Sequence, residues 1–428
     1  MNDELRLHIP TLEELWYRRG LLQDPDTMSY NKGCELNFDG YDNDTGCIDF
    51  PERKWAEWYA YFVGQEQRYY AYIARRSDGA FIGEVNLHKN QNAEWFDMGI
   101  VIEAKYRGNG YAERALGLLL RQAFEHMGAE AVHNDFEAER AAALKAHLSA
   151  GFTVIGQENG IAELSISRER YFRGKAVRKM VSAIADILAQ NQPSIYLYGS
   201  CVLNDFRLGW SDIDIVVLTQ ERISAEQARE LVGLRRKMLE AESDNPYYRL
   251  FEGAMLPLSA FVSGNSDCVV YWGTSGERIT DTYSFDSFNM TLLLQSGRML
   301  YGQDIRCQLE MPSRKALCSD VRTHYESIRQ YARTTRRGIY SFGWLLDIAR
   351  GLYTLRTNTI ASKTEAARWV LENGLCPVSE ALETALKVRL DPIKSQNDVN
   401  VLNYSETLGR EIQSFADVLG EELKTTEI

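Results

Sequence analysis

Apolar and polar residues alternate in several short stretches of the first 170 residues, a pattern that is typical of half-buried strands. Candidate strands cover Tyr70–Arg75, Ala80–His88 and Trp95–Ile102. Apolar residues at helical spacing follow over 112–127, and Gly128 is a natural end for that helix. The pattern therefore predicts a mixed sheet with amphipathic helices.

A change to polar and charged composition over 157–175 separates this part from the rest. A helix is predicted over about 174–190, and apolar strands over Ser194–Tyr198 and 213–218. From about residue 285 the pattern is almost wholly helical, with helices expected at Ser327–Thr334, Phe342–Arg356, Ser362–Glu372, Val378–Leu386 and near Glu406–Leu423. We predict an α/β (α+β) multidomain protein: a mixed-sheet domain at 1–170, a small α/β domain at 171–285 and a helical domain at 286–428.

Composition is that of an ordinary globular protein. Of the 428 residues, 45% are hydrophobic and 25% charged, which suits two or three domains with cores of their own. No apolar run reaches the ~18 residues of a membrane span, and the acidic beginning lacks an apolar signal segment. The seven cysteines include no C-x-x-C pair, so neither a disulfide framework nor a zinc knuckle is expected. We expect a cytoplasmic protein.

Negative charge is concentrated in the first part of the chain. The net charge is −12, and residues 1–170 carry 18 Lys and Arg against 28 Asp and Glu. An acidic surface disfavours nucleic acid and suits a cationic small molecule or a basic polypeptide. A solvated face that only aids solubility is an equally good interpretation.

Small residues gather where the third candidate strand leads into the predicted helix. The sequence there is Arg107-Gly108-Asn109-Gly110-Tyr111-Ala112. Small residues let backbone N–H groups approach a ligand, and a helix N-terminus adds unsatisfied donors and partial positive charge. The turn therefore suits a pyrophosphate; a glycine-rich turn that merely caps a helix is the alternative.

This turn resembles motif A of the GCN5-related N-acetyltransferases (GNAT), (Gln/Arg)-x-x-Gly-x-(Gly/Ala), with Arg107, Gly110 and Ala112 in the motif positions. Residues 141–152 resemble a later helix of that family, and the resemblance covers about residues 5–168. It implies that the backbone of 107–112 holds the pyrophosphate of acetyl-CoA. It also implies that the strand edge at 98–102, Ile102 included, pairs with the pantetheine arm.

Proton transfer in this domain has several candidates. His147 stands where many family members carry a Tyr that protonates the leaving thiolate; an imidazole can donate a proton, and a structural histidine is an equally good interpretation. Asp97 and Glu84 on the candidate strands, or Glu103 after them, can take a proton from an ammonium acceptor through water. Each of these carboxylates can also be structural.

A second constellation lies at 199–214. Gly199-Ser200 follows one apolar strand, and Ser-Asp-Ile-Asp at 211–214 opens the next. Period-two geometry puts Asp212 and Asp214 on one face, some ~7 Å apart. Two carboxylates so placed can share Mg²⁺, which prefers oxygen ligands and substrate phosphates. Two solvated acids at a strand start are the alternative.

Gly-Ser followed by Asp-x-Asp resembles the signature of the DNA polymerase β-like nucleotidyltransferases. The resemblance implies that the nucleotide is held by Gly199, Ser200 and Ser211. It also implies that Mg²⁺ on Asp212 and Asp214 stabilises the α-phosphoryl group during displacement of pyrophosphate.

Family members need a third carboxylate on a neighbouring strand. Glu252 is the acid inside the otherwise apolar strand predicted over 248–256. A lone charge there is costly unless it is paired or bound to metal. We predict that Glu252 is a metal ligand, the general base for an acceptor hydroxyl, or both.

Residues 346–353 and 359–369 resemble the C-terminal domain of streptomycin/spectinomycin adenylyltransferases, and this resemblance covers about residues 175–425. It implies that Arg350 and Lys363 reach the nucleotide phosphates; ordinary solvated helix residues are the alternative. Streptomycin-modifying members place an acid ten positions before that Arg, where this chain has Tyr340. This departure argues against streptomycin and leaves another aminoglycoside or an aminocyclitol open.

Together the motifs predict a bifunctional enzyme that modifies aminoglycoside-type antibiotics. Its cofactors would be acetyl-CoA for N-acetylation, and ATP with Mg²⁺ for O-adenylylation. The expected partner is a cationic small molecule, with neither nucleic acid nor membrane. One alternative is an enzyme acting on protein or peptide acceptors. Another is a nucleotidyltransferase regulated by a non-catalytic acyl-CoA-binding domain, which His147 in place of Tyr favours.

Overall fold

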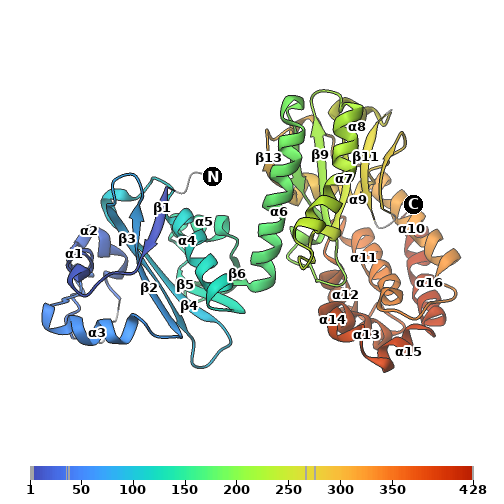
Figure 1. Ribbon diagram of the computed structural model, residues 1–428. Coiled ribbons are helices and arrows are strands. Elements are labelled where there is room, and N and C mark those ends of the chain that lie inside the picture. Colours follow the sequence, from blue (N-terminus) through green and yellow to red (C-terminus); the bar gives the residue numbers. More distant parts are fainter. Residues whose placement is uncertain (1–3, 35, 37–38, 266–267, 274–275, 427–428) are drawn as a thin grey trace. The chain divides into compact units, whose positions relative to one another are not determined.

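The computed structural model describes residues 4–426 except 35, 37–38, 266–267 and 274–275, and it divides into two compact units, Met1–Lys175 and Ala176–Ile428 (Figure 1). Both units combine a mixed sheet with helices, which confirms the predicted fold class. Helix α6 (Arg168–Ile187) runs across the division. The polar segment 157–175, expected as a separator, holds strand residues of the first unit and the start of this helix.

A seven-stranded sheet, in the order β1-β2-β3-β4-β5-β7-β6, forms the centre of the first unit. Its strands are β1 Leu5–His8, β2 Arg68–Arg75, β3 Phe81–Lys89, β4 Phe96–Ile102, β5 Ala131–Glu137, β6 Thr153–Glu158 and β7 Ile161–Ser167. Neighbours run antiparallel apart from β4 and β5, which are parallel. The three candidate strands of the sequence correspond to β2, β3 and β4.

Helices cover both faces of this sheet (Figure 1). Helices α4 (Tyr111–Arg121) and α5 (Ala141–Ala150) pack on the face that carries Val85, Leu87 and Met98. Helices α1 (Trp16–Gln23) and α3 (Trp55–Phe62) pack on the other face, against Tyr70 and Tyr72. Because side chains alternate along a strand, this second face also carries the polar side chains Glu84, Asn86, His88 and Asp97.

The second unit contains a six-stranded sheet in the order β12-β11-β10-β9-β8-β13. Its strands are β8 Ser194–Leu197, β9 Ile213–Thr219, β10 Phe251–Pro257, β11 Val269–Gly273, β12 Gly276–Thr280 and β13 Arg298–Tyr301. Strands β9 and β10 are parallel and the other pairs antiparallel. Helix α7 (Ala225–Ala241) covers one face, where Trp272 donates to the Leu231 carbonyl. Helices α8 (Leu258–Ser263) and α9 (Ser287–Ser296) pack on the other.

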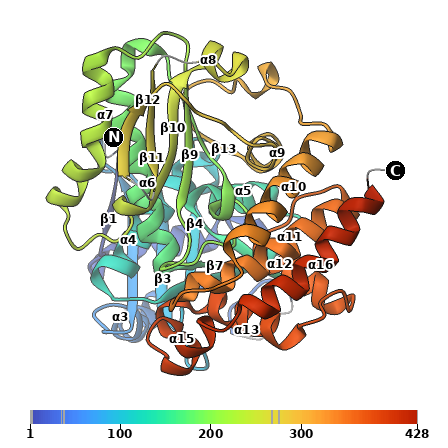
Figure 2. The ribbon, with the colours of Figure 1, turned by 90° about the vertical axis from the view of Figure 1, so that its right-hand side faces the viewer.

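This sheet extends beyond the boundary predicted near residue 285. Strand β13 pairs with β8, so the chain after 285 is not wholly helical. From Arg314 onward it forms the helices α10 Arg314–Tyr331, α11 Gly343–Thr357, α12 Lys363–Glu372, α13 Ser379–Leu390, α14 Pro392–Ser395, α15 Val399–Ser405 and α16 Gly409–Thr426. Figure 2 shows α11 between α12 and α16, around a core that includes Leu346, Ala367 and Phe415. Within the described ranges, no helix is long and apolar enough to cross a membrane.

Candidate functional site

Three carboxylates of the second unit meet where β9 and β10 begin. The parallel register pairs Asp214 with Glu252, and Asp212 precedes Asp214 by two residues. Asp212 and Glu252 lie within hydrogen-bonding reach of each other. Burial, followed by repulsion among the three groups, raises the pKa of Asp212 to about 6 and that of Asp214 to about 8. The ionised cluster is therefore unstable until a cation joins it.

The turn after β8 is shaped around Asp214. Gly199 has a φ of +68°, and a Cβ at this position would overlap Asp214 Oδ2, so a side chain does not fit. The adjacent Ser200 hydroxyl is buried and has no hydrogen-bond partner among the described residues. An unsatisfied buried donor is costly, and a phosphate oxygen would satisfy it. Ser211, by contrast, already accepts from the Arg207 N–H at 3.1 Å.

Two cations from the helical part of this unit face the carboxylates. Arg350 lies on α11, Lys363 begins α12, and the charge of both lowers the pKa of Asp214 against the effect of burial. They share Asp347: its Oδ1 lies 2.9 Å from Lys363 Nζ and 3.8 Å from Arg350 Nη2. The structure therefore brings the predicted residues Asp212, Asp214, Glu252, Arg350 and Lys363 together.

Three residues around these carboxylates were missed in the sequence. Asp347 has the i,i+3 spacing to Arg350 as its only signal. Tyr271 of β11 donates to Glu252 Oε1 at 2.9 Å. Asp205, 3% exposed, accepts from two helices, at 2.7 Å from Arg389 and 2.6 Å from the Thr364 hydroxyl. Asp205 thus fastens the 199–211 loop to α12 and α13.

These residues fit Mg²⁺ held together with substrate phosphates. In the part of the chain that the structure describes, no three His, Cys, Asp or Glu side chains form a preformed metal cage. Mg²⁺ is commonly held by one or two carboxylates, phosphate oxygens and water, so Asp212 and Asp214 suffice on the protein side. Partial burial, and after it the charge of Asp212, raises the pKa of Tyr340, whose ring packs on Trp210.

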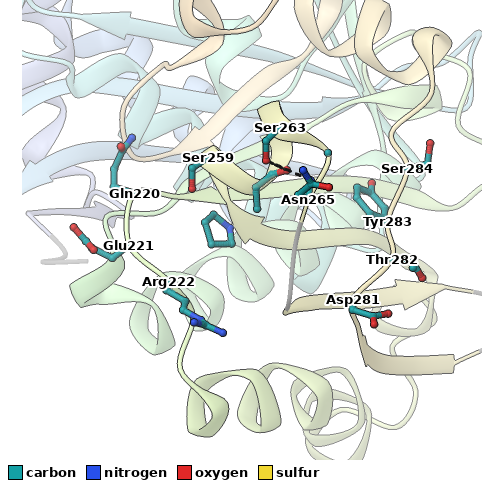
Figure 3. Close-up of a pocket in the computed structure, with 13 residues that line it drawn as sticks. Gln220, Glu221, Arg222, Ser259, Ser263, Asn265, Asp281, Thr282, Tyr283 and Ser284 are labelled. Atoms are coloured by element: carbon teal, nitrogen blue, oxygen red, sulfur yellow. Dashed lines mark hydrogen bonds between the residues drawn. The ribbon is translucent and has the colours of Figure 1, made fainter.

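A cavity of about 1130 Å³ opens at the C-terminal ends of β9 and β10, away from the carboxylates at the start of these strands. Its lining includes Arg222, Ser259, Asp281 and Tyr283. Figure 3 shows these side chains spread around an open hollow rather than converging on one point. None of the predicted site residues lines this cavity, so it is separate from the carboxylate cluster.

In the first unit, the parallel strands β4 and β5 diverge. They pair only at Phe96 with Val132 and at Asp97 with His133, although both strands continue. From Met98 to Ile102, the edge of β4 that faces β5 therefore has no strand partner in the described sheet, while the opposite edge pairs with β3. An extended arm with amide groups can pair with such an edge, which is the role predicted for pantetheine.

The turn after β4 leads into α4 as predicted. Gly108 and Gly110 have φ values of +80° and +72°, and Gly110 is the N-cap of α4. No side chain caps this eleven-residue helix, so its first N–H groups remain for water or an anion. Ala112 lies in the first turn, half-buried, and the Tyr111 ring is buried in the core.

Arg107 and Asn109 hold the backbone of this turn. The Arg107 guanidinium donates to the carbonyl oxygens of Ile102, Asp26 and Thr27, so it joins the end of β4 to α2 (Pro25–Met28). The Asn109 amide donates to the carbonyl oxygens of Tyr106 and Arg107. In this geometry the backbone, rather than these two side chains, is available to a pyrophosphate.

His147 is buried in the core, at 2% exposure. Its Nδ1–H donates to the Ala143 carbonyl at 2.8 Å, and its Nε2 accepts from the Asn134 amide at 2.9 Å. The ring packs between Phe136 and Phe152. Burial lowers the pKa of His147, so the neutral imidazole is the stable form.

The predicted carboxylates of β3 and β4 already have partners. Glu84 forms a buried ion pair with Arg18 and accepts from the Tyr70 hydroxyl. Asp97 accepts from the side chains of Asn90, Trp95 and His133, at 2.7, 3.0 and 3.3 Å. Glu103 accepts from Tyr17 and pairs with Lys105. Beside Glu84 and Asp97 lies a pocket of about 390 Å³ that the sequence did not predict, with Arg18, Arg68, Asn86 and His88 in its lining.

The two units match different protein families. Residues 5–153 match the acetyltransferase (GNAT) domain, residues 181–247 the nucleotidyltransferase domain, and residues 312–414 the C-terminal domain of aminoglycoside adenylyltransferases. The chain is a GNAT acetyltransferase domain fused to an aminoglycoside-adenylyltransferase-type nucleotidyltransferase. It is thus an enzyme with an acetyltransferase unit and a nucleotidyltransferase unit, as the motifs predicted.

Solved structures resemble the acetyltransferase unit. A spermidine N-acetyltransferase from Vibrio cholerae, in complex with CoA and spermine, is 18% identical, with a TM-score of 0.33; the match covers 40% of this chain and 99% of that one. A GNAT-family acetyltransferase from Bacillus anthracis is 15% identical, with a TM-score of 0.31, over 39% of this chain and 96% of that one. Among curated proteins, none matches the chain.

Proposed function

We propose that the chain modifies aminoglycoside- or aminocyclitol-type antibiotics by O-adenylylation in the nucleotidyltransferase unit, and that the acetyltransferase unit transfers an acetyl group from acetyl-CoA to an amine. The observation that carries the proposal is the cluster of Asp212, Asp214 and Glu252 facing Arg350 and Lys363. It occurs in a unit whose residues 312–414 match the C-terminal domain of aminoglycoside adenylyltransferases.

In adenylylation, bound Mg²⁺ supplies charge stabilisation at the α-phosphoryl group. Asp212 and Asp214 would hold the ion, and the Ser200 hydroxyl would donate to a phosphate oxygen. Arg350 and Lys363, paired with Asp347 in this structure, neutralise the triphosphate. Glu252, oriented by the Tyr271 hydroxyl, takes the proton of the acceptor hydroxyl.

In acetylation, the β4 edge at 98–102 and the uncapped start of α4 support the binding of acetyl-CoA. We assign His147 a structural role, because both ring nitrogens and both ring faces have partners within the core. The acidic first part of the sequence predicts a polycationic acceptor such as an aminoglycoside. Arg18 and Arg68 in the pocket beside Asp97 favour instead an amine that also carries a negatively charged group.

Mass spectrometry of an aminoglycoside and aminocyclitol panel tests the proposal, with the enzyme given ATP–Mg²⁺ and, separately, acetyl-CoA. A mass gain of one adenylyl group, absent when Mg²⁺ is chelated, is the expected result for the nucleotidyltransferase unit. If neither donor modifies any compound of the panel, the assignment to antibiotics is wrong. Adenylylation of a protein or peptide instead would favour the alternative acceptors.

A further inference from the structure

The pocket of about 390 Å³ lies on the face of the acetyltransferase sheet that α1 and α3 cover. The strand register places Asn86 of its lining opposite Gly99, and His88 opposite Asp97. Asp97 is also the last residue of β4 that pairs with β5. An amine held in this pocket would therefore lie next to the point where the open β4 edge begins, which is the proposed site of the acetyl carrier.

Guanidinium groups occupy the aromatic faces of the pocket. Arg18 lies 4.4 Å from the ring centroid of Trp58 and 5.4 Å from that of Tyr70. Arg68 lies 4.0 Å from the ring centroid of Tyr61, whose hydroxyl it also contacts at 2.6 Å. Aromatic faces are where a pocket would bind an ammonium group, and here they are already covered by cations.

The charges of the lining do not cancel. Glu84 neutralises Arg18, while no carboxylate in the described part of the chain forms an ion pair with Arg68. The Nε of Arg18 is buried and has no hydrogen-bond partner among the described residues. Burial lowers the pKa of His88, so the neutral imidazole is the favoured form and does not offset the charge of Arg68. A polycation would meet like charge in this pocket, whereas an anionic group would find unused donors.

We propose that the acetyltransferase unit acetylates a small primary amine that also carries a carboxylate, an amino-acid-like acceptor, and rejects polycationic amines. The carboxylate lies against Arg68 and Arg18, because a guanidinium fork matches the two carboxylate oxygens. The amine points to His88 and the β4 edge. This inference rests on the proposed acetyl transfer, and it leaves the cationic acceptor of the nucleotidyltransferase unit unchanged.

The reaction balances with the groups at hand. The ammonium loses one proton, for which His88, 3.8 Å from Asp97, is the neutral imidazole in the wall. The amine nitrogen then forms a bond to the thioester carbonyl carbon, and the carbon–sulfur bond breaks. The thiolate takes up the second proton that the nitrogen loses. The products are the N-acetylated amine, CoA and one released proton.

Matched amines that differ only in the carboxylate provide the test. Tyrosine against tyramine and phenylalanine against phenethylamine, with spermidine and an aminoglycoside added, are assayed for CoA thiol release. We expect a kcat/KM at least about tenfold higher for the carboxylated member of each pair, in line with a hydrogen bond to a charged group. Arg68→Gln should bring this preference close to one, and Arg68→Glu should reverse it. Arg121→Gln makes the same charge change at an exposed position of α4, and should leave the preference as in the wild type.

Each outcome decides the inference. A wild-type enzyme that prefers tyramine, or acetylates spermidine or the aminoglycoside faster than tyrosine, overturns it while acetyl transfer stands. If no amine is acetylated, calorimetry of tyrosine with the CoA-loaded full chain takes over. Binding that is lost in Arg68→Gln supports the pocket and rejects acetyl transfer by this unit; the absence of binding rejects both.

Discussion

The carboxylates of the two units differ in what surrounds them. In the acetyltransferase unit, Glu84 is paired with Arg18, and Asp97 accepts three side-chain hydrogen bonds. In the nucleotidyltransferase unit, Asp212, Asp214 and Glu252 face one another, and burial with mutual repulsion raises the pKa of the first two.

This difference separates a positioning role from a ligand-binding role. A buried carboxylate with partners fixes the side chains that it touches, whereas clustered carboxylates need a cation that the protein does not supply. The charge without a compensating partner is negative in the nucleotidyltransferase unit, at the three carboxylates, and positive in the acetyltransferase unit, at Arg68. We therefore expect the two sites to select groups of opposite charge: a Mg²⁺ cation at the carboxylates of the nucleotidyltransferase unit, and a carboxylate at Arg68 of the acetyltransferase unit.

Replacing Asp212 and Asp214 together by Asn should produce the largest effect. We expect nucleotidyl transfer to fall by at least about a thousandfold, because the charge that holds Mg²⁺ is removed. Relief of the repulsion should at the same time raise the free energy of unfolding by about 1 kcal/mol. Pyrophosphate release measures the first change, and denaturant unfolding of the full chain the second.

The matched control for this variant is Asp186→Asn, an exposed position of α6. It should alter neither quantity, and acetyl transfer by the double variant should equal that of the wild type. Retention of more than a tenth of the nucleotidyl transfer would contradict the metal assignment. A loss of stability would mean that the cluster is structural.

Gly110→Trp should impair the binding of acetyl-CoA by the acetyltransferase unit. A side chain at this positive φ is strained, and a bulky ring would cover the first N–H groups of α4. We expect the KM for acetyl-CoA to rise roughly a hundredfold with nucleotidyl transfer unchanged. Gly117→Ala, within the same helix and with open space around it, is the control. If the wild type acetylates nothing and Gly110→Trp alters nucleotidyl transfer, the regulatory alternative is favoured.

Features with a local sequence pattern could be predicted, whereas features that depend on distant residues could not. Alternation located β2, β3 and β4, and Gly-Ser with Asp-x-Asp located Gly199, Ser200 and the two aspartates, because both signals depend on local spacing. Strand β13 was missed: its four residues pair only at the edge of the sheet, so their pattern is weak.

The pocket of the acetyltransferase unit has no such local signal. Arg18 and Arg68 lie 50 positions apart, and only the packing of α1 and the register of β2 with β3 bring them to His88. Arg107 illustrates the opposite case. Its motif position predicted a turn whose backbone holds a pyrophosphate. Its side chain satisfies backbone oxygens of a segment about 80 residues away, which spacing cannot reveal.

Asp205→Asn tests how firmly the nucleotidyltransferase site is assembled. The substitution leaves Arg389, 3% exposed, without its charged partner, which should lower the free energy of unfolding by about 3 kcal/mol. Because Arg389→Met removes the other half of the pair, the double variant should lose less than the sum of the single ones. Denaturant unfolding of all four proteins measures this coupling. Additive losses would show that the pair does not fasten the loop to the helices.

Asp347→Asn should produce the smallest and most specific effect. Burial lowers the pKa of Lys363, and the charge of Asp347 opposes that decrease, so removing it should lower this pKa further. Lys363 must be charged to attract phosphates, so the KM for ATP should begin to rise at a lower pH than in the wild type. Near neutral pH we expect a rise of roughly threefold, with kcat little changed.

Arginine at position 363 keeps its charge at any working pH. In the double variant Asp347→Asn with Lys363→Arg, the KM for ATP should therefore no longer rise with increasing pH. If Asp347 served only to pack α11 against α12, the pH at which the KM for ATP rises would be the same in Asp347→Asn as in the wild type. A shift that Lys363→Arg cancels can arise only from the charge at position 363, because the packing defect is common to both variants.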